Sequence, residues 1–189
     1  RSHDKITFPG IWANSCCSHP LDIEGENGDP VQGCINAAKR KLPQELGIDQ
    51  DTANSMEFSH LGSFQYKCRW NEEWLENEVD HVLITRVDSL EIFPNENEIS
   101  GHKWIGPEGI RQVMEGSGEW EGEIVAPWFR LLWREFLAEQ YPYFDDIKES
   151  NEDTANDFEE IVPLISSFDI EKKELDFEIL NQENLPESV

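Results

Sequence analysis

Basic residues are scarce in this chain. It has 15 lysine and arginine residues against 40 aspartate and glutamate residues, which gives a formal net charge of -25 at pH 7. A protein that binds nucleic acid needs a basic surface to neutralise phosphates, so this composition argues against nucleic-acid binding. The imbalance is strongest in residues 145–189, which hold 15 acidic and three basic residues. That segment has no histidine, cysteine or arginine, and we expect no chemistry from it.

Long apolar runs, internal repeats and a cysteine scaffold are also missing. No stretch approaches the roughly 18 apolar residues of a membrane-spanning helix, so we expect no membrane span. The four cysteines, Cys16, Cys17, Cys34 and Cys68, form no CxxC pair and favour a reducing compartment, for which the cytoplasm is the default. The first residue is Arg1 instead of methionine, so we expect an N-terminally incomplete chain, and the residues given predict no signal or transit segment.

The length of 189 residues predicts one domain, because it is too short for two full-sized domains and a tail. Hydrophobic residues make up 38% of the chain, and the seven tryptophans and ten phenylalanines indicate a globular protein. We place the domain at residues 1–144. Residues 145–189 are predicted to be an acidic tail that is partly disordered or packed on the domain.

The segment FPGIWANSCCSHP, residues 8–20, carries the densest group of reactive side chains in the sequence. If it is extended, side chains alternate between two faces, so Cys17 and His19 share one face and Cys16 points to the other. Pro20 favours an extended conformation at His19. A cysteine and a histidine at this spacing serve a metal site, a thiol nucleophile or no function. From these residues alone, a buried structural thiol is an equally good interpretation.

A loop and a helix follow this segment. Residues 21–29 are rich in Asp, Asn, Glu and Gly and predict a loop. Asp29 as an N-cap and Gly47 as a stop signal bracket a predicted helix over Val31–Leu46. Pro43 lies inside this helix, and we expect it to kink or shorten the helix because proline lacks the amide donor.

Strands and further helices are predicted beyond Gly47. Two runs alternate as β-strands do, Met56–Lys67 and Glu76–Val87, and the residues between them predict a hairpin loop. A short strand is expected at His102–Ile105, followed by a helix from Pro107. A last helix is predicted over residues 127–140. Its expected buried face consists of large apolar side chains: Trp128, Leu131, Leu132, Phe136 and Leu137.

Glu76 and Glu78 lie two residues apart on a predicted strand and therefore on one face. Two carboxylates this close raise each other's pKa unless a cation lies between them, an arrangement found in metal sites and in general acid–base pairs. The alternative, an ordinary solvent-facing pair in an acidic protein, stays open on spacing alone.

Lys39, Arg40 and Lys41 form the single basic triplet of the sequence and lie on the predicted helix. Together with Lys5 and Arg1, they would suit a diphosphate or another small anion. An ordinary solvated helix face is an equally good interpretation of the triplet.

Four segments in combination point to one family. ITFPGIWANSCCSHPL, NAAKRKLPQELGI, LENEVDHVL and APWFRLLW resemble, in order and spacing, the type I isopentenyl-diphosphate isomerases, and the resemblance covers residues 1–140. It implies an α/β, Nudix-like fold in which helices flank a mixed sheet. It also implies the interconversion of isopentenyl and dimethylallyl diphosphate by a 1,3-proton shift.

The same resemblance implies catalytic roles for four residues. Cys17 aligns with the family's catalytic thiol and Glu78 with its catalytic carboxylate. One of them delivers a proton to the alkene and the other removes one from the far carbon. Tyr66 matches the tyrosine that assists the glutamate. Trp128 matches the ring that faces the carbocation, which an aromatic face stabilises without trapping it.

Two divalent metal sites are also implied by the resemblance. His19, Glu76 and Glu78 match ligands of an inner metal, which would be Mg²⁺, Mn²⁺ or Zn²⁺. Glu45 matches the glutamate that holds Mg²⁺ against the diphosphate, a role that suits a hard cation. Two further histidines of the family's inner site would lie upstream of Arg1, so either the chain is N-terminally incomplete or this metal site is incomplete.

Arg1, Lys5 and Lys41 match the family positions that contact the diphosphate of the substrate. Lys41 stands where the family usually has arginine, so a point charge replaces a bidentate contact. Pro43 is foreign to the family's helix, and we expect it to shift Glu45 or Lys41.

We therefore predict a monomeric isopentenyl-diphosphate isomerase that acts on a prenyl diphosphate. The first alternative is a Nudix-type diphosphate hydrolase, which usually needs a glutamate-rich helix, whereas this helix offers Glu45 alone. The second alternative is a non-catalytic or truncated paralogue that binds prenyl diphosphate or metal without turnover.

Overall fold

The computed structural model describes residues 1–138, 162–165 and 177–179. A long hairpin of β1 (Phe58–Arg69) and β2 (Leu75–Thr85) organises this part of the chain, and its two strands pair antiparallel. Both strands and the hairpin loop predicted from the sequence are confirmed. The register sets Tyr66 directly opposite Glu78, so the two side chains leave the same face of the hairpin.

Short strands extend this hairpin and form a second sheet. β5 (Phe177–Ile179) pairs antiparallel with β1, which gives the order β2–β1–β5. β3 (His102–Ile105), a strand predicted at these residues, pairs antiparallel with β4 (Val162–Ile165). A parallel bridge joins Trp12 to Val125. The described part of the chain therefore combines helices with small antiparallel sheets.

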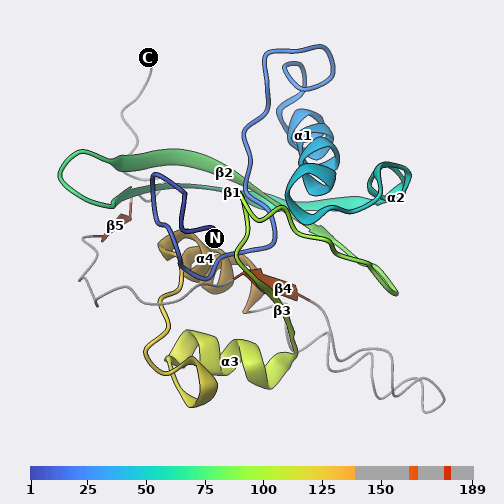
Figure 1. The fold of residues 1–189 in the computed structure, drawn as a ribbon. Helices are drawn as coiled ribbons and strands as arrows, with labels where there is room; N and C mark the ends of the chain where they lie inside the picture. The colour runs from blue at the N-terminus through green and yellow to red at the C-terminus, as the bar shows by residue number, and fades with distance from the viewer. Residues whose placement is uncertain (139–161, 166–176, 180–189) are drawn as a thin grey trace.

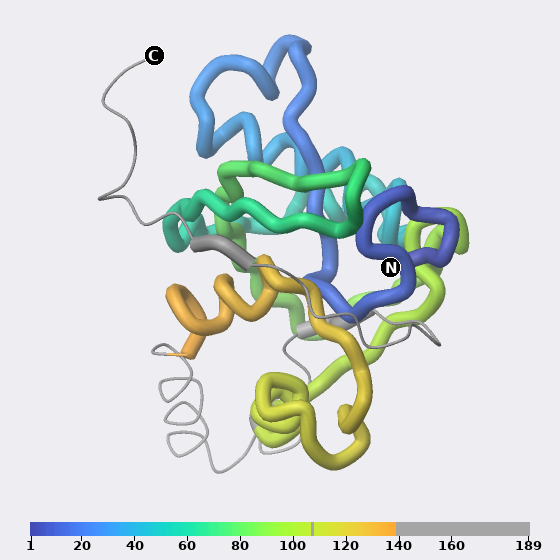
Figure 2. Tube along the Cα trace, turned by 90° about the vertical axis from the view of Figure 1, so that its left-hand side faces the viewer, coloured from blue at the N-terminus to red at the C-terminus, as the bar shows by residue number. Residues whose placement is uncertain are grey.

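Helices lie on both sides of the β1–β2 hairpin. In Figure 1, α1 (Pro30–Leu46) is above the hairpin and α4 (Pro127–Leu132) is below it, and the turned view of Figure 2 keeps this order. The N-terminal segment packs against α4, since the rings of Phe8 and Trp128 are 5.3 Å apart. Within the described residues, no helix has the length and apolar character needed to cross a membrane.

The helix α1 begins and ends where the sequence predicts. Asp29 caps it by accepting a hydrogen bond from the Gln32 amide at 2.8 Å. Gly47 ends it with φ of 63°, a left-handed conformation that glycine adopts at low cost. The expected shortening at Pro43 is wrong, because the helix continues through this residue to Leu46.

A neighbouring helix supplies the donor that Pro43 lacks. This helix, α2 (Gln50–Ser55), is capped by Asp49 and is not predicted from the sequence pattern. In an ordinary helix the amide at position 43 would donate to the Lys39 carbonyl. Here Gln50 Nε2 donates to that carbonyl instead, at 3.3 Å. The loss of one helical hydrogen bond at this interior proline is thereby partly offset.

Replacing Gln50 with alanine is expected to lower the free energy of unfolding by about 1 kcal/mol, because the Lys39 carbonyl loses its donor. In a Pro43→Ala background the restored amide satisfies this carbonyl, so Gln50→Ala is expected to cost much less. Urea unfolding of all four members of this double-mutant cycle measures the coupling. Equal costs in the two backgrounds would show that Gln50 does not replace the missing amide.

The helix predicted from Pro127 changes type along its length. α4 ends at Leu132 and is followed by a π-helical turn, η2 (Trp133–Leu137), in which the Ala138 amide donates to the Trp133 carbonyl at 2.8 Å. The expectation of one uninterrupted α-helix is therefore wrong. Residues 139 and 140 of the predicted helix lie outside the described residues.

Gly62 of β1 makes room for the π-helical turn. A β-carbon at this position would come within 2.5 Å of the Phe136 ring, and the φ of 149° is also unfavourable for other residues. Phe136 packs on Phe64 as well, with the ring centroids 5.8 Å apart. Of the predicted buried face, Trp128 and Leu131 are buried. The other three members are half-buried: Leu132, Phe136 and Leu137.

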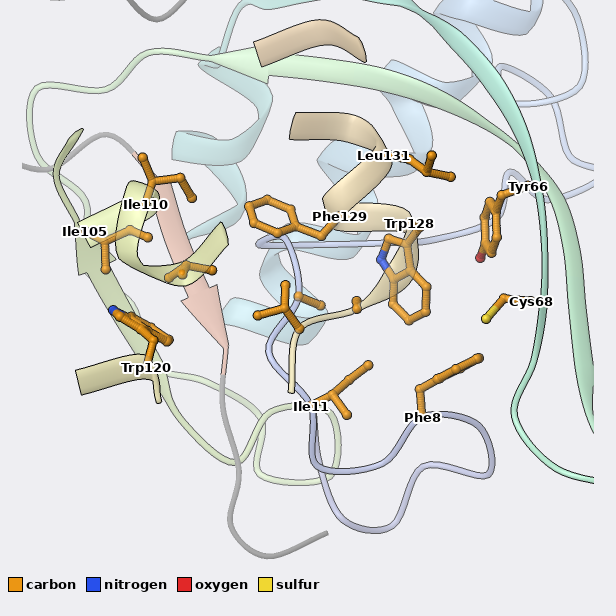
Figure 3. Packing of buried hydrophobic residues seen from close by; sticks show 14 residues of the cluster. Phe8, Ile11, Tyr66, Cys68, Ile105, Ile110, Trp120, Trp128, Phe129 and Leu131 are labelled. Atoms are coloured by element: carbon orange, nitrogen blue, oxygen red, sulfur yellow. The ribbon is translucent and has the colours of Figure 1, made fainter. Parts of the chain in front are cut away.

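Two clusters of apolar side chains form the core. The first joins the N-terminal segment, β1, α4, the predicted helix α3 (Pro107–Glu115) and the 3₁₀ turn η1 (Gly118–Trp120). Figure 3 shows Trp128 with Tyr66 on one side and Phe129 on the other, and with Ile11 and Phe8 below the indole. The second cluster packs α1 against α2 and the loop before β3. It consists of Leu42, Leu46, Ile48, Ala53, Met56 and Ile99.

Candidate active site

Three carboxylates project from one face of β2. Glu76, Glu78 and Asp80 occupy alternate positions on the strand, so they share a face with Tyr66 of the paired strand. The hydroxyl of the buried Tyr66 lies 3.0 Å from Glu76 Oε2 and 3.3 Å from Glu78 Oε2, and it is the donor in both contacts. The two carboxylates that the sequence singles out are therefore held against one phenol group.

Asp80 belongs to this site but is not among the residues predicted from the sequence. Burial, together with the charges of Glu78 and Glu76, raises the pKa of Asp80 to about 7. The sequence did contain a signal for Asp80, namely its spacing. Asp80 lies two residues after Glu78, so it continues the alternation that puts Glu76 and Glu78 on one face of the strand. Carboxylates grouped in this way favour a shared proton or a bound cation.

The two adjacent thiols have different surroundings, as the alternation of an extended segment predicts. Cys16 faces α1, where burial and the nearby Glu45 raise the pKa of its thiol. Both cysteines line a cavity, and Cys17, the more exposed of the two, lies near the carboxylates of β2. Desolvation by the surrounding protein and the charges of Asp80 and Glu78 raise the pKa of Cys17 well above its usual value. The Cys17 thiol is therefore protonated at neutral pH and suited to donate a proton.

His19 approaches the same carboxylates from the N-terminal segment. Its Nε2 lies 3.6 Å from Glu78 Oε1, and its side chain is exposed. Imidazole and carboxylate groups together suit a divalent cation. Across the part of the chain that the structure describes, however, no group of three or more His, Cys, Asp or Glu side chains is arranged to hold a metal ion. The ligand set His19, Glu76 and Glu78 stays a prediction.

Trp128 is held in place by the segment that carries the two thiols. Its ring is buried, and its Nε1 donates to Asn14 Oδ1 at 3.0 Å. Asn14 Nδ2 in turn donates to the Cys16 carbonyl at 2.8 Å. The Trp128 ring lies 5.9 Å from the Tyr66 ring, and the Arg1 guanidinium carbon lies 5.4 Å from the Trp128 ring centroid. Asn14 thus couples the position of the indole to that of the thiol segment.

A cavity of about 510 Å³ lies between α1, β2 and α4. Its polar lining includes Cys17, Glu78 and Asp80, and the indole of Trp128 forms part of its wall. Much of the remaining lining is apolar, which limits access of water to the reacting groups. One space therefore contains a protonated thiol, carboxylates and an aromatic ring. This combination can transfer protons to and from a hydrocarbon and stabilise a positive charge between the two steps.

Several curated proteins resemble the chain over most of its length. It is 41% identical over 137 residues to isopentenyl-diphosphate Delta-isomerase of Dictyostelium discoideum, which covers 70% of this chain and 56% of that protein. It is 35% identical over 168 residues to isopentenyl-diphosphate Delta-isomerase I of Camptotheca acuminata, covering 87% and 69%. The chain belongs to the isopentenyl-diphosphate Delta-isomerase family.

The family relationship extends to plant organelle proteins. Isopentenyl-diphosphate Delta-isomerase II, chloroplastic, of Arabidopsis thaliana is 38% identical over 148 residues, which are 77% of this chain and 51% of that protein. The chain thus spans little more than half the length of the Dictyostelium and Arabidopsis isopentenyl-diphosphate Delta-isomerases. No family model matches the chain.

The cations expected to bind diphosphate in the isopentenyl-diphosphate Delta-isomerase family lie around a second, smaller cavity. This cavity, of about 30 Å³, is lined by Arg1, Lys5 and Glu45, and it adjoins the two thiols. Lys41 lies beside it, with its Nζ 3.2 Å from Glu45 Oε1. We expected Pro43 to shift Glu45 or Lys41. The two residues nevertheless form an ion pair, one turn apart on α1.

The basic triplet divides its contacts among three parts of the molecule. Lys39 Nζ donates to the Asn54 carbonyl at 2.7 Å. Arg40 Nε donates to Glu26 Oε1 at 2.6 Å, and the Glu26 side chain is buried. Lys41 is the member that pairs with Glu45, a residue that lines the smaller cavity. For an isopentenyl-diphosphate Delta-isomerase, the triplet therefore offers one cation near the predicted diphosphate, because the other two stabilise the loop before α1 and the end of α2.

Three further residues contact the predicted site and are not among those predicted from the sequence. Thr7 Oγ1 donates to Glu76 Oε1 at 2.6 Å, and Asn14 holds the indole as described. Glu98 lines the smaller cavity and accepts a hydrogen bond from Lys5 Nζ. Asn14 lies in the segment that carries the two thiols, and this position was the signal that could have identified it. Thr7 and Glu98 carry no signal of their own in the sequence.

Proposed function

We propose that this chain catalyses the interconversion of isopentenyl and dimethylallyl diphosphate. The observation that carries the proposal is the shared cavity, which Cys17, Glu78 and Trp128 line together. Family membership supports it, since the named relatives are isopentenyl-diphosphate Delta-isomerases. The substrate is accordingly a prenyl diphosphate.

The proposed reaction uses each group in the state that its surroundings favour. Cys17, kept protonated by its raised pKa, donates its proton to the terminal alkene carbon, and the double-bond electrons form the new C–H bond. The resulting tertiary carbocation faces the Trp128 ring, which stabilises it without attacking it. Glu78 then removes a proton from the far carbon, and the C–H electrons form the new double bond. Tyr66, which contacts both Glu76 and Glu78, orients Glu78 for this step.

We propose two divalent metal sites, because the side chains at each site are donors that such cations prefer. Glu45, next to Arg1 and Lys5, would hold Mg²⁺ against the diphosphate, where the cation neutralises phosphate charge. His19, Glu76 and Glu78 would hold an inner Mg²⁺, Mn²⁺ or Zn²⁺. Hard carboxylates and one imidazole are donors that suit such a cation. Asp80 lies beside them, and burial together with the charges of Glu78 and Glu76 raises its pKa to about 7. 

The domain extent, the oligomeric state and the location of the protein are proposals as well. We propose that residues 1–144 form a Nudix-like domain followed by an acidic tail at 145–189, and that the protein is a monomer. A cytoplasmic location rests on the cysteine pattern alone, because the Arabidopsis relative is named chloroplastic. A diphosphate hydrolase is less well supported, since α1, with the sequence PVQGCINAAKRKLPQEL, offers only the carboxylate of Glu45.

Turnover of isopentenyl diphosphate in deuterated water tests the proposed function. We expect dimethylallyl diphosphate that carries deuterium in the newly formed methyl group, with no release of phosphate or pyrophosphate. Release of either without deuterium incorporation would instead favour a hydrolase. Binding of the substrate with no turnover and no exchange would favour a protein that only binds prenyl diphosphate.

A further inference from the structure

Glu98 lies in the smaller cavity, and the family resemblance gives it no role. Lys5 Nζ donates to Glu98 Oε2, and the two side chains are only 30% and 26% exposed. The backbone around Glu98 is fixed, because its amide donates to the Asn95 carbonyl at 2.8 Å and its carbonyl accepts from the Ser2 amide at 2.9 Å. Ile99, the next residue, is buried in the core. The Glu98 carboxylate is therefore held against Lys5 by the fold.

Carboxylates pair with two of the three cations expected to meet the diphosphate. Glu98 pairs with Lys5, and Glu45 pairs with Lys41. The Arg1 side chain donates to two backbone carbonyls, and neither of these contacts neutralises its positive charge. Three positive groups and two negative ones leave a net charge of +1 where a ligand with several negative charges has to bind.

The charge of Glu98 also affects Glu45, a second carboxylate of the smaller cavity. Burial raises the pKa of Glu45, and the negative charge of Glu98 adds to this effect while Lys41 opposes it. The two carboxylates therefore lie close enough to influence each other, and both line the cavity that Arg1 and Lys5 also line. A diphosphate entering alone would meet both of these negative charges as well as the cations.

We propose that Glu98 neutralises Lys5 in the free protein and thereby makes diphosphate binding at this site depend on a divalent cation. The proposal rests on the proposed function for the identity of the ligand. Without a divalent cation, the phosphate oxygens compete with Glu98 for the Lys5 ammonium group. A cation that binds together with the diphosphate supplies the positive charge that the two ion pairs withhold. Because the Lys5 pair is partly buried, salt screens it less than a surface pair.

Binding of inorganic pyrophosphate, measured by calorimetry in EDTA and again in excess Mg²⁺, tests this proposal. We expect Glu98→Gln to bind pyrophosphate roughly tenfold more tightly than the unmodified chain in EDTA, since an ion-paired lysine becomes free. The gain in affinity on adding Mg²⁺ should shrink by a similar factor. Glu96→Gln is the matched control. Glu96 is exposed on the same loop, and its substitution changes net charge equally but should alter affinity by less than twofold.

A cycle with Lys5→Gln separates neutralisation of Lys5 from simple repulsion of the ligand. In the Lys5→Gln background, Glu98→Gln should give a clearly smaller gain in EDTA. An equal gain in both backgrounds, or a Glu98→Gln chain that binds no more tightly than Glu96→Gln, would overturn the proposal. Either result leaves the proposed isomerase activity standing, because deuterium incorporation is measured separately on the unmodified chain. Thermal unfolding of each variant checks that it is folded, and Glu98→Ala provides a second test of the same charge.

Discussion

Replacing Cys17 with alanine is expected to lower the rate of isomerisation by about 10³-fold or more, because the alkene loses its proton donor. Replacing Cys16 with alanine is expected to retain most of the activity. The two thiols are adjacent in sequence but differ in surroundings, since Cys17 opens toward Asp80 and Glu78 and Cys16 contacts Glu45. Initial rates of dimethylallyl diphosphate formation at saturating substrate measure the difference.

Stability separates this catalytic effect from a loss of fold. Cys16 packs against the cluster that contains Leu42 and Leu46, so Cys16→Ala should lower the free energy of unfolding by about 1 kcal/mol. Cys17 opens into a cavity, and Cys17→Ala should leave stability nearly unchanged. The variant with the larger effect on unfolding is thus expected to be the more active one. Equal loss of activity in both variants would contradict the division of roles between the thiols.

The local features of this fold follow from its sequence because they depend on neighbouring residues. The ends of α1 are set by Asp29 and Gly47, each of which acts within its own turn. The pairing of β1 with β2 follows from two alternating runs and a short loop. Alternation also accounts for the opposite directions of Cys16 and Cys17, although residues 14–20 form an irregular segment and not a regular strand.

Contacts between distant segments are what the sequence could not supply. Asn14 meets Trp128 across 114 positions, and Lys5 meets Glu98 across 93. No local pattern marks such a partner, because any polar side chain with suitable reach satisfies the donor. The tolerance of α1 for Pro43 is a similar case, since it depends on Gln50 from the next helix.

In the candidate site, too, local patterns were visible in the sequence and contacts between distant segments were not. Cys17, Glu78 and Trp128 line one cavity and Tyr66 contacts Glu78, an arrangement that agrees with the roles that the family resemblance implies, although the roles themselves stay predictions. Asp80 shows what the resemblance leaves out. Its spacing was visible in the sequence, but its surroundings became apparent only when burial and the two neighbouring glutamates were known together.

Replacing Asp80 with asparagine is expected to stabilise the metal-free protein at pH 8 by about 2 kcal/mol and to have almost no effect near pH 4. The folded-state pKa of Asp80 is raised to about 7 from an ordinary value of 3.8. Below pH 4 the carboxyl group is protonated in both the folded and the unfolded chain. Between pH 4 and 7 only the unfolded chain ionises, so stability falls as the pH rises, and above pH 7 the penalty is constant.

The expected size is about half of what the full shift would give at roughly 1.36 kcal/mol per pH unit, because solvent partly reaches the side chain. Urea unfolding in EDTA from pH 4 to 8 measures it, with Asp88→Asn as the control, since Asp88 is exposed just after β2. A stability difference that does not change with pH would contradict the origin assigned to it. Adding a divalent cation should shrink the advantage of Asp80→Asn at pH 8, because a cation near Glu76 and Glu78 favours the ionised aspartate. Such a decrease would link the destabilising effect of the carboxylate cluster to the metal that the cluster is proposed to bind.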